Sequence, residues 1–136
     1  MLRQPPETRG TEVKTVLLVD DEHAILDALS GILEDEGFQV VTAGNGREAL
    51  ARLAEAVPDV ALVDVMMPLM DGRELLREMH GDARWRTIPV VLMSAVPQSI
   101  LERDAPLACV GFFQKPFDLW KLLARLKELA DRKQDP

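Results

Sequence analysis

Short apolar runs alternate with stretches of helical period along most of this chain. In the longer stretches, apolar residues recur every three or four positions, as they do along one face of a helix. This alternation predicts βα units, in which parallel strands form a sheet covered by helices on both faces. The expected strands are Val16–Asp20, Gln39–Ala43, Asp59–Asp64, Pro89–Met93 and Cys109–Phe113.

The helices between these strands are marked to different degrees. The first, Ala24 to Glu36, carries an apolar stripe at helical spacing and is followed by Gly37, which favours a helix stop. The last is expected to begin after Asp118, a good N-cap residue, and has a long stripe of leucines. Between the fourth and fifth strands, Pro97 and Pro106 leave room for only about two helical turns, so this helix should be short or irregular.

Five such units predict an α/β fold: a five-stranded parallel doubly wound sheet of the flavodoxin-like type, with strand order 2-1-3-4-5. Ligands of these sheets bind beyond the carboxyl ends of the strands, at the point where the strand order reverses. We expect the folded domain over residues 15–132, between a flexible N-terminal segment, 1–14, and a C-terminal tail, 133–136.

Composition and charge exclude several classes of function. The 136 residues suit one domain, and a formal net charge of −7 opposes binding to nucleic acid or to an anionic membrane. No apolar run approaches the ~20 residues that cross a bilayer, and no signal peptide is visible. The single cysteine, Cys109, fits a reducing compartment. We therefore expect a cytoplasmic protein without direct nucleic acid binding or membrane insertion.

Acidic residues end the first and third strands, at the edge of the sheet where a ligand is expected. Asp20 and Asp21 follow the first apolar run, and Asp64 follows the third. Three carboxylates brought together repel one another, and a divalent cation relieves that repulsion. With no histidine or cysteine ligand among them, the cluster suits Mg²⁺, or Mn²⁺, better than Zn²⁺.

Two other strand ends supply groups that bind phosphoryl oxygens. Ser94 follows the fourth apolar run, and Lys115 follows the fifth; a hydroxyl and an ammonium both donate hydrogen bonds to an oxyanion. A carboxylate can itself attack phosphorus and form an aspartyl phosphate. Asp64 is the best placed nucleophile, because the other two carboxylates can hold the metal while it attacks.

Together these segments resemble the receiver domain of two-component response regulators, over roughly residues 15 to 132. The resemblance rests on Asp20-Asp21 after an apolar run, Asp64 with Pro68 and Gly72 downstream, Ser94-Ala95, and Phe112-Phe113-Gln114-Lys115-Pro116-Phe117. It implies that Asp64 is the phosphoacceptor and that Asp20 and Asp21 are metal carboxylates. The implied phosphodonor is a sensor histidine kinase or a histidine phosphotransfer protein, and the implied output is a conformational switch read by protein-protein contact.

The same resemblance assigns finer roles. The backbone carbonyl of Met66 is a further metal ligand, Ser94 is a hydroxyl switch, and Lys115 binds the phosphoryl group and precedes a cis peptide bond to Pro116. Phe112 is the aromatic switch; it stands where the family often has tyrosine, which allows a rotamer switch and removes a hydroxyl contact. Catalysis would be self-directed, consisting of phosphotransfer to the domain and later autodephosphorylation, so the chain is not expected to be a conventional enzyme.

Two other functions remain open at this point. A phosphatase of the haloacid dehalogenase type also uses an aspartate nucleophile with Mg²⁺, but it needs a spaced Asp-x-Asp pattern that Asp20-Asp21-Glu22 lacks. A flavodoxin-like cofactor module would need a phosphate-binding glycine loop after the first strand, where this chain has acids. Steady turnover of phosphate esters would favour the phosphatase, and a coloured protein would favour the cofactor module.

Three methionines, Met66, Met67 and Met70, lie close after Asp64. Methionine fills irregular gaps in cores, so packing is favoured over a special function for this group. The apolar side chain of Met66 cannot orient an attacking water, which predicts a long-lived acyl phosphate. For Trp120, packing at the core edge and contact with a partner are expected about equally.

Overall fold

Residues 12–133 are described by the structure, a computed structural model; most of the predicted flexible segment and tail lies outside these residues. Strands and helices alternate along the described part, in the order that the sequence predicts. They are β1 (Thr15–Val19), α1 (His23–Asp35), β2 (Gln39–Ala43), α2 (Gly46–Glu55), β3 (Val60–Asp64), α3 (Gly72–His80), β4 (Val90–Ser94), α4 (Gln98–Leu101), β5 (Gly111–Gln114) and α5 (Leu119–Lys133).

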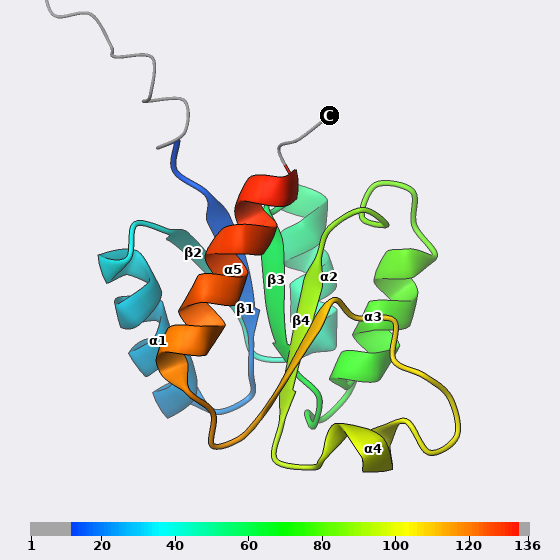
Figure 1. Cartoon of the computed structure of the whole chain (residues 1–136). Helices are drawn as coiled ribbons and strands as arrows, with labels where there is room; N and C mark the ends of the chain where they lie inside the picture. Colours follow the sequence, from blue (N-terminus) through cyan, green and yellow to red (C-terminus); the bar gives the residue numbers. More distant parts are fainter. Residues whose placement is uncertain (1–11, 134–136) are drawn as a thin grey trace, which may run out of the picture.

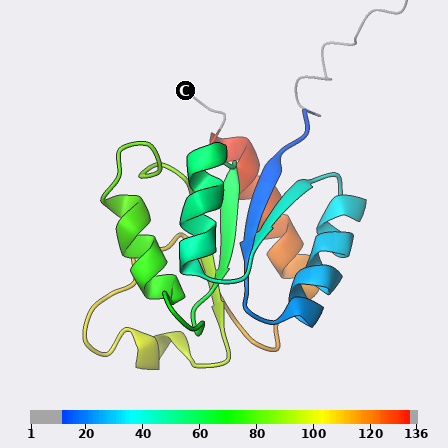
Figure 2. The ribbon, with the colours of Figure 1, turned by 180° about the vertical axis from the view of Figure 1, so that it is seen from behind.

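All strand pairs are parallel, and the strand order is β2-β1-β3-β4-β5, as predicted. Helices α1 and α5 cover one face of the sheet, and α2 and α3 cover the other, which is clearest when the two opposite views are compared (Figure 1, Figure 2). The short α4 lies beside the carboxyl ends of the strands. The order reverses between β1 and β3, so the loops after these two strands border the same crevice.

The core lies in two layers, one on each face of the sheet. Successive strand residues point to opposite faces, so Leu17 and Val19 pack with α2 and α3, whereas Val16 and Leu18 pack with α1 and α5. Every residue of β3 and of β4 is buried. The carboxyl ends of these central strands are therefore held in fixed positions, and so are the polar residues at those ends.

The predicted boundaries agree within one residue for the first four strands and differ by up to two for the last. β5 begins at Gly111 instead of Cys109, because β4 begins only at Val90 and its register pairs Val91 with Gly111. The residues before Gly111 have no ladder partner beyond a single hydrogen bond from Val110 N–H to the Val90 carbonyl, 2.9 Å long.

The ends of the helices follow the predicted signals. Gly37 adopts a φ of 98° just after α1, a conformation that glycine tolerates without strain. The Asp118 carboxylate accepts hydrogen bonds from the backbone N–H groups of Trp120 and Lys121, and so caps α5. Helix α4 is a single turn that begins after Pro97, which confirms the prediction of a short fourth helix.

Candidate functional site

The carboxyl ends of β1 and β3 bring three carboxylates together. One oxygen from each of Asp20, Asp21 and Asp64 lies within 4.8 Å of the other two. Asp20 is fully buried, Asp64 is 5% exposed, and Asp21 is exposed. The two buried side chains therefore form the floor of the cluster, and the third faces solvent. The cluster is thus open on one side, where an ion or a substrate can enter from water.

Lys115 connects the two buried carboxylates. Its Nζ atom lies 3.0 Å from Asp64 Oδ1 and 3.2 Å from Asp20 Oδ2. The other oxygen of Asp20 accepts a hydrogen bond of 2.9 Å from the Glu22 backbone N–H, which fixes the carboxylate. The peptide bond between Lys115 and Pro116 is cis, as expected from the sequence resemblance.

The electrostatics of this cluster follow from burial and crowding. Burial raises the pKa of Asp64 from 3.8 to about 6; the hydrogen bond from Lys115 opposes that rise, and the charge of Asp20 adds to it. For Lys115, burial acts to lower the pKa, but the hydrogen bond and charge of Asp64, with those of Asp20, outweigh burial and raise it. Lys115 therefore stays cationic, and its hydrogen bond and charge keep the pKa of Asp64 from rising further.

Ser94 ends β4 beside this cluster and is fully buried. Its Oγ atom accepts a hydrogen bond of 3.0 Å from the Val96 backbone N–H. Its carbonyl accepts one of 2.8 Å from the Lys115 backbone N–H, so the serine and the lysine are tied through the main chain. The hydroxyl proton is not used in either of these contacts.

The loop from β3 to α3 is folded tightly against Asp64. A Cβ atom on Gly72 would lie 2.6 Å from the Asp64 carbonyl oxygen, so only glycine fits. The Gly72 N–H donates to the Val65 carbonyl at 2.8 Å, and Asp71 with Glu74 forms a capping box at the start of α3. These contacts fix the chain that carries the phosphoacceptor candidate.

The three methionines of this loop do not behave alike. Val65 and Met67 are buried in the core, and Met70 packs partly against it, so gap filling is correct for Met67 and Met70. It is wrong for Met66, which is 51% exposed. Val65 and Met67, on either side of Met66, both pack in the core layer under α2 and α3, so Met66 is turned away from that layer toward solvent.

The predicted aromatic switch lies on β5, and the tryptophan for which partner contact was one of two expectations lies at the start of α5. Phe112 is half-buried, is paired in register with Leu92 of β4, and packs against the core layer under α2 and α3. Trp120, in the first turn of α5, is 71% exposed, so it does not pack at the core edge.

An apolar hollow beside Lys115 was not foreseen from the sequence. It has a volume of about 520 Å³ and lies between α1 and the loop that follows β5; its walls are Ile25, Ala28, Leu29, Ala95, Lys115, Pro116 and Phe117. The sequence gives no sign of it, because the exposure of Ala28 on α1 is known only from the structure. Because its two walls come from opposite ends of the chain, no local pattern could reveal the hollow.

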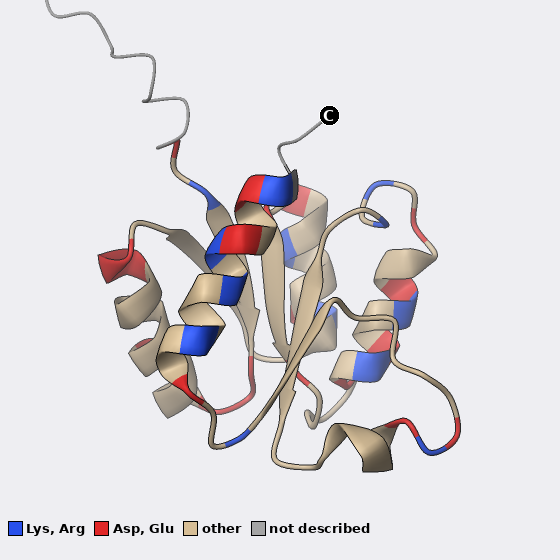
Figure 3. Cartoon of the chain, in the orientation of Figure 1, with Lys and Arg blue, Asp and Glu red and all other residues tan. Residues whose placement is uncertain are grey.

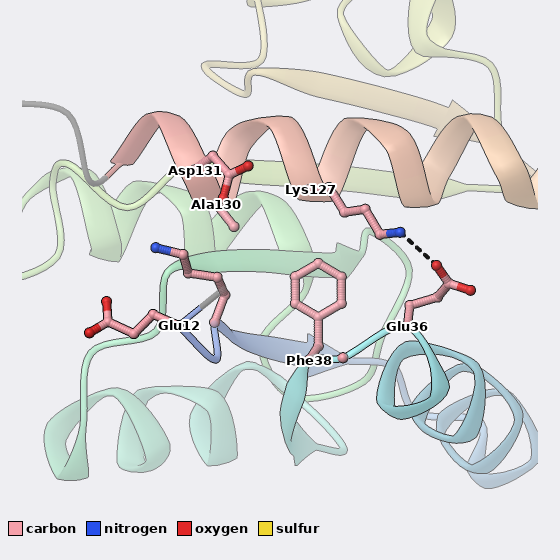
Figure 4. Close-up of a pocket in the computed structure, with 8 residues that line it drawn as sticks. Glu12, Glu36, Phe38, Lys127, Ala130 and Asp131 are labelled. Carbon is pink, nitrogen blue, oxygen red and sulfur yellow. Dashed lines mark hydrogen bonds and ion pairs between the residues drawn. The ribbon is translucent and has the colours of Figure 1, made fainter. Parts of the chain in front are cut away.

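A second hollow, of about 280 Å³, lies at the other end of β1. Phe38 forms its floor, and the ion pair of 2.6 Å between Lys127 of α5 and Glu36 closes one side (Figure 4). Glu12 and Lys14, which precede β1, also line it. Since β1 separates it from the carboxylate cluster, this hollow is not part of the candidate site.

The carboxylate cluster has the donor chemistry of a Mg²⁺ site. Hard divalent cations prefer carboxylate and carbonyl oxygens together with water, and here two buried acids adjoin one exposed acid. The acidic loop after β1 and the loop after β5 lie at the same end of the sheet (Figure 3). Asp20, Asp21 and Asp64 are the residues that would hold the ion.

Comparison with known proteins gives one consistent result. The family model for the response regulator receiver domain matches residues 16–127. Response regulator Rre1 of Synechocystis sp. is 35% identical over 122 residues, which are 88% of this chain and 53% of that protein. The probable transcriptional regulatory protein TcrX of Mycobacterium tuberculosis is 35% identical over 120 residues, which are 87% of this chain and 50% of that protein.

A solved structure extends the similarity to the fold. The signal receiver domain of a signal transduction histidine kinase from Syntrophus aciditrophicus matches with a TM-score of 0.83 and 32% identity, covering 91% of this chain and 95% of that chain. The chain spans about half the length of the curated relatives named above. None of these matches favours the phosphatase or the cofactor module. Within residues 12–133, no helix has the length and apolar character to cross a membrane.

Proposed function

Because this chain belongs to the response regulator receiver family, we propose that it is a phosphorylation-activated signalling domain in which Asp64 accepts a phosphoryl group from a histidine side chain. The observation that carries this proposal is the contact of 3.0 Å between Lys115 Nζ and Asp64 Oδ1 inside a cluster of three carboxylates. A buried nucleophilic carboxylate, a cation and a metal-binding pair are the groups that phosphoryl transfer requires.

The proposed step is an in-line displacement at phosphorus. An oxygen of Asp64 forms a bond to phosphorus while the bond between phosphorus and the donor imidazole nitrogen breaks; the electron pair of that bond stays on the nitrogen, which then takes up a proton. With a pKa of about 6, Asp64 is mostly ionised at neutral pH and can attack. Lys115 and the Ser94 hydroxyl donate hydrogen bonds to the oxygens of the transferred group.

Asp20, Asp21 and Asp64, with the backbone carbonyl of Met66, are the proposed metal ligands. Bound Mg²⁺, or Mn²⁺ in its place, would neutralise charge that develops on the phosphoryl oxygens. Asp20 is already fixed by the Glu22 N–H and by Lys115, so it needs little rearrangement to bind an ion. The same arrangement would support the later attack of water on the acyl phosphate, which returns the domain to its resting state.

The signal is proposed to pass through Ser94 and Phe112. A hydroxyl that turns toward the phosphoryl group must give up its hydrogen bond with Val96 N–H, and movement at this strand end makes room for Phe112 to change rotamer in the neighbouring strand. The output is then a changed surface read by another protein. Direct nucleic acid binding is not expected of a chain with a formal net charge of −7. A cytoplasmic location remains a prediction.

Replacement of Asp64 by asparagine tests the central claim. Asp64→Asn keeps the shape of the side chain and removes the nucleophile, so labelling by acetyl phosphate or by a cognate kinase should be lost. Asp27→Asn is the matched control, because Asp27 is exposed on α1 and outside the cluster. Asp64→Asn protein that is labelled to the level of the Asp27→Asn control would refute the assignment.

The apolar hollow supports a protein phosphodonor over a small molecule as the physiological source. A partner that places its phosphohistidine over Asp64 must cover the surface that borders Lys115, and the hollow offers apolar area there to bury. Its α1 wall, formed by Ile25, Ala28 and Leu29, is where a helix of a histidine kinase or phosphotransfer protein would pack.

A charge placed in the hollow tests whether a partner protein docks there, because it should affect transfer from a protein donor and leave labelling by a small donor unchanged. Ala28→Arg should slow transfer from a phosphohistidine protein by tenfold or more, since burying an unpaired charge costs on the order of a few kcal/mol. Labelling by acetyl phosphate, which needs no docking surface, should stay at the wild-type rate. Glu34→Arg, also on α1 but away from the hollow, is the control. Equal slowing with both phosphodonors, or with both variants, would remove the hollow from the docking surface.

A further inference from the structure

Met66 differs from the other methionines of the described residues in its access to solvent. It is 51% exposed, whereas Met67 is 9% exposed and Met79 and Met93 are fully buried; Met70 is partly buried and packs against the core. Exposure to solvent makes a thioether easier for an oxidant to reach. Among the methionines of residues 12–133, Met66 is therefore the one that a dissolved oxidant reaches first.

The thioether of Met66 lies where its oxidation can affect a group bound to Asp64. Met66 lies two residues after Asp64, and neither side chain packs in the core layer that holds Val63, Val65 and Met67. Val65 and Met67, which alternate with them, are turned into the core. The exposed thioether thus borders the open side of the carboxylate cluster, where water reaches a group bound to Asp64.

We propose that Met66 is a redox-sensitive modification site, at which oxidation by a hydroperoxide shortens the life of the phosphate on Asp64. The inference rests on the proposed function of Asp64 as phosphoacceptor. The thioether sulfur attacks the outer peroxide oxygen, a sulfur-oxygen bond forms, the oxygen-oxygen bond breaks, and water or an alcohol leaves. The sulfur loses two electrons and the peroxide gains them. A thiol-dependent sulfoxide reductase reverses the change.

A sulfoxide and a thioether differ in how strongly they accept hydrogen bonds from water. The thioether sulfur is a weak hydrogen-bond acceptor, whereas the sulfoxide oxygen is a strong one. Hydrolysis of an acyl phosphate needs a water molecule oriented toward phosphorus and able to pass on a proton. A sulfoxide at Met66 can hold such a water, and one well-placed hydrogen bond changes a rate by on the order of tenfold.

The experiment uses the full chain and hydrogen peroxide. Peptide mass spectrometry after brief exposure should find the added oxygen on Met66 well before Met67, Met79 or Met93. Protein with and without this treatment is then labelled with acetyl phosphate, and the half-life of the phosphorylated form is measured in each. We expect the oxidised protein to lose its phosphate about tenfold faster and to recover the original half-life after treatment with sulfoxide reductase.

Met66→Leu serves as the control, because leucine keeps a similar volume and the backbone carbonyl but cannot be oxidised. Its phosphate half-life should be the same before and after peroxide. Oxidation that reaches the buried methionines as early as Met66, or a half-life that Met66 oxidation leaves unchanged, overturns the inference. Failure of the untreated protein to accept any phosphoryl group instead overturns the proposed function and the claim about half-life with it, while the order of oxidation is still decided by mass spectrometry.

Discussion

Lys115 and Asp64, at the carboxyl ends of different strands, form an ion pair of 3.0 Å at the edge of the sheet. The lysine also reaches Asp20 at 3.2 Å, so one cation serves two buried carboxylates. A phosphoryl group on Asp64 brings its own negative oxygens and competes for the same ammonium. We therefore expect the position of Lys115, at the start of the loop that leads to α5, to change when that group is present.

Divalent metal should be required for labelling. The cluster carries three negative charges against one lysine, and a dianionic donor cannot approach it without further neutralisation. We expect excess EDTA to abolish labelling by acetyl phosphate. Asp21→Ala should weaken Mg²⁺ binding by tenfold or more and reduce labelling in parallel. Mg²⁺ at ~100 times its dissociation constant should stabilise the wild-type fold by about 2.7 kcal/mol, measured by urea unfolding; labelling that persists in EDTA would contradict the metal site.

Lys115→Ala should separate metal binding from signalling. Without the ammonium, we expect Asp20 and Asp64 still to bind Mg²⁺, but the phosphoryl group then has no charged contact with the residue that follows β5. Beryllofluoride, which occupies the phosphoryl position, should shift amide resonances of β5 and the start of α5 in the wild type and leave most of them in place in this variant. Lys121→Ala, which removes an exposed cation from α5, is the control and should respond like wild type. A full set of shifts in Lys115→Ala would show that the lysine does not couple the two regions.

The sequence predicts the strands and the acidic cluster because both appear as local patterns, and it predicts the strand order because five successive βα units indicate a doubly wound sheet. Buried strands appear as continuous apolar runs, and Asp20 and Asp64 interrupt them at the ends where ligands bind. The start of β5 could not be predicted, since it depends on where β4 begins in the register. The exposure of Met66 was missed because Val65, Met66 and Met67 are all apolar, so the sequence does not show which of them faces the core.

The stability of the metal-free protein should depend on the charge of Asp64. Its pKa rises from 3.8 to about 6 on folding, so the folded state binds the proton more tightly than the unfolded state. Protonation therefore stabilises the fold, and stability falls as pH rises through that interval. The cost at neutral pH is on the order of 2 to 3 kcal/mol. Asp64→Asn should be more stable than wild type at pH 7 and lose this advantage near pH 4, as read by urea unfolding in EDTA. An advantage independent of pH would show that Asp64 is not the titrating group.

Two glycines offer a matched test of the loop that carries Asp64. Gly72→Ala places a methyl group 2.6 Å from the Asp64 carbonyl oxygen, so the loop must move. We expect a loss of stability of about 1 to 3 kcal/mol together with slower labelling. Gly31→Ala, where nothing lies within 4 Å on α1, should instead stabilise by about 0.5 to 1 kcal/mol and leave labelling unchanged. Normal labelling by a fully folded Gly72→Ala protein would show that the close approach has no part in positioning the carboxylate.

Met66 should set the lifetime of the acyl phosphate through its lack of a polar group. Asparagine at this position would present an amide that can orient water toward phosphorus, and a good hydrogen bond contributes about 1 to 1.5 kcal/mol, or roughly tenfold in rate. Met66→Asn should therefore lose its phosphate about tenfold faster than wild type. Met66→Leu, apolar like the native residue, should stay close to the wild-type rate of loss. Because Met66 is 51% exposed, neither change should disturb folding, and unchanged or slower decay in Met66→Asn would show that the thioether does not protect the phosphate.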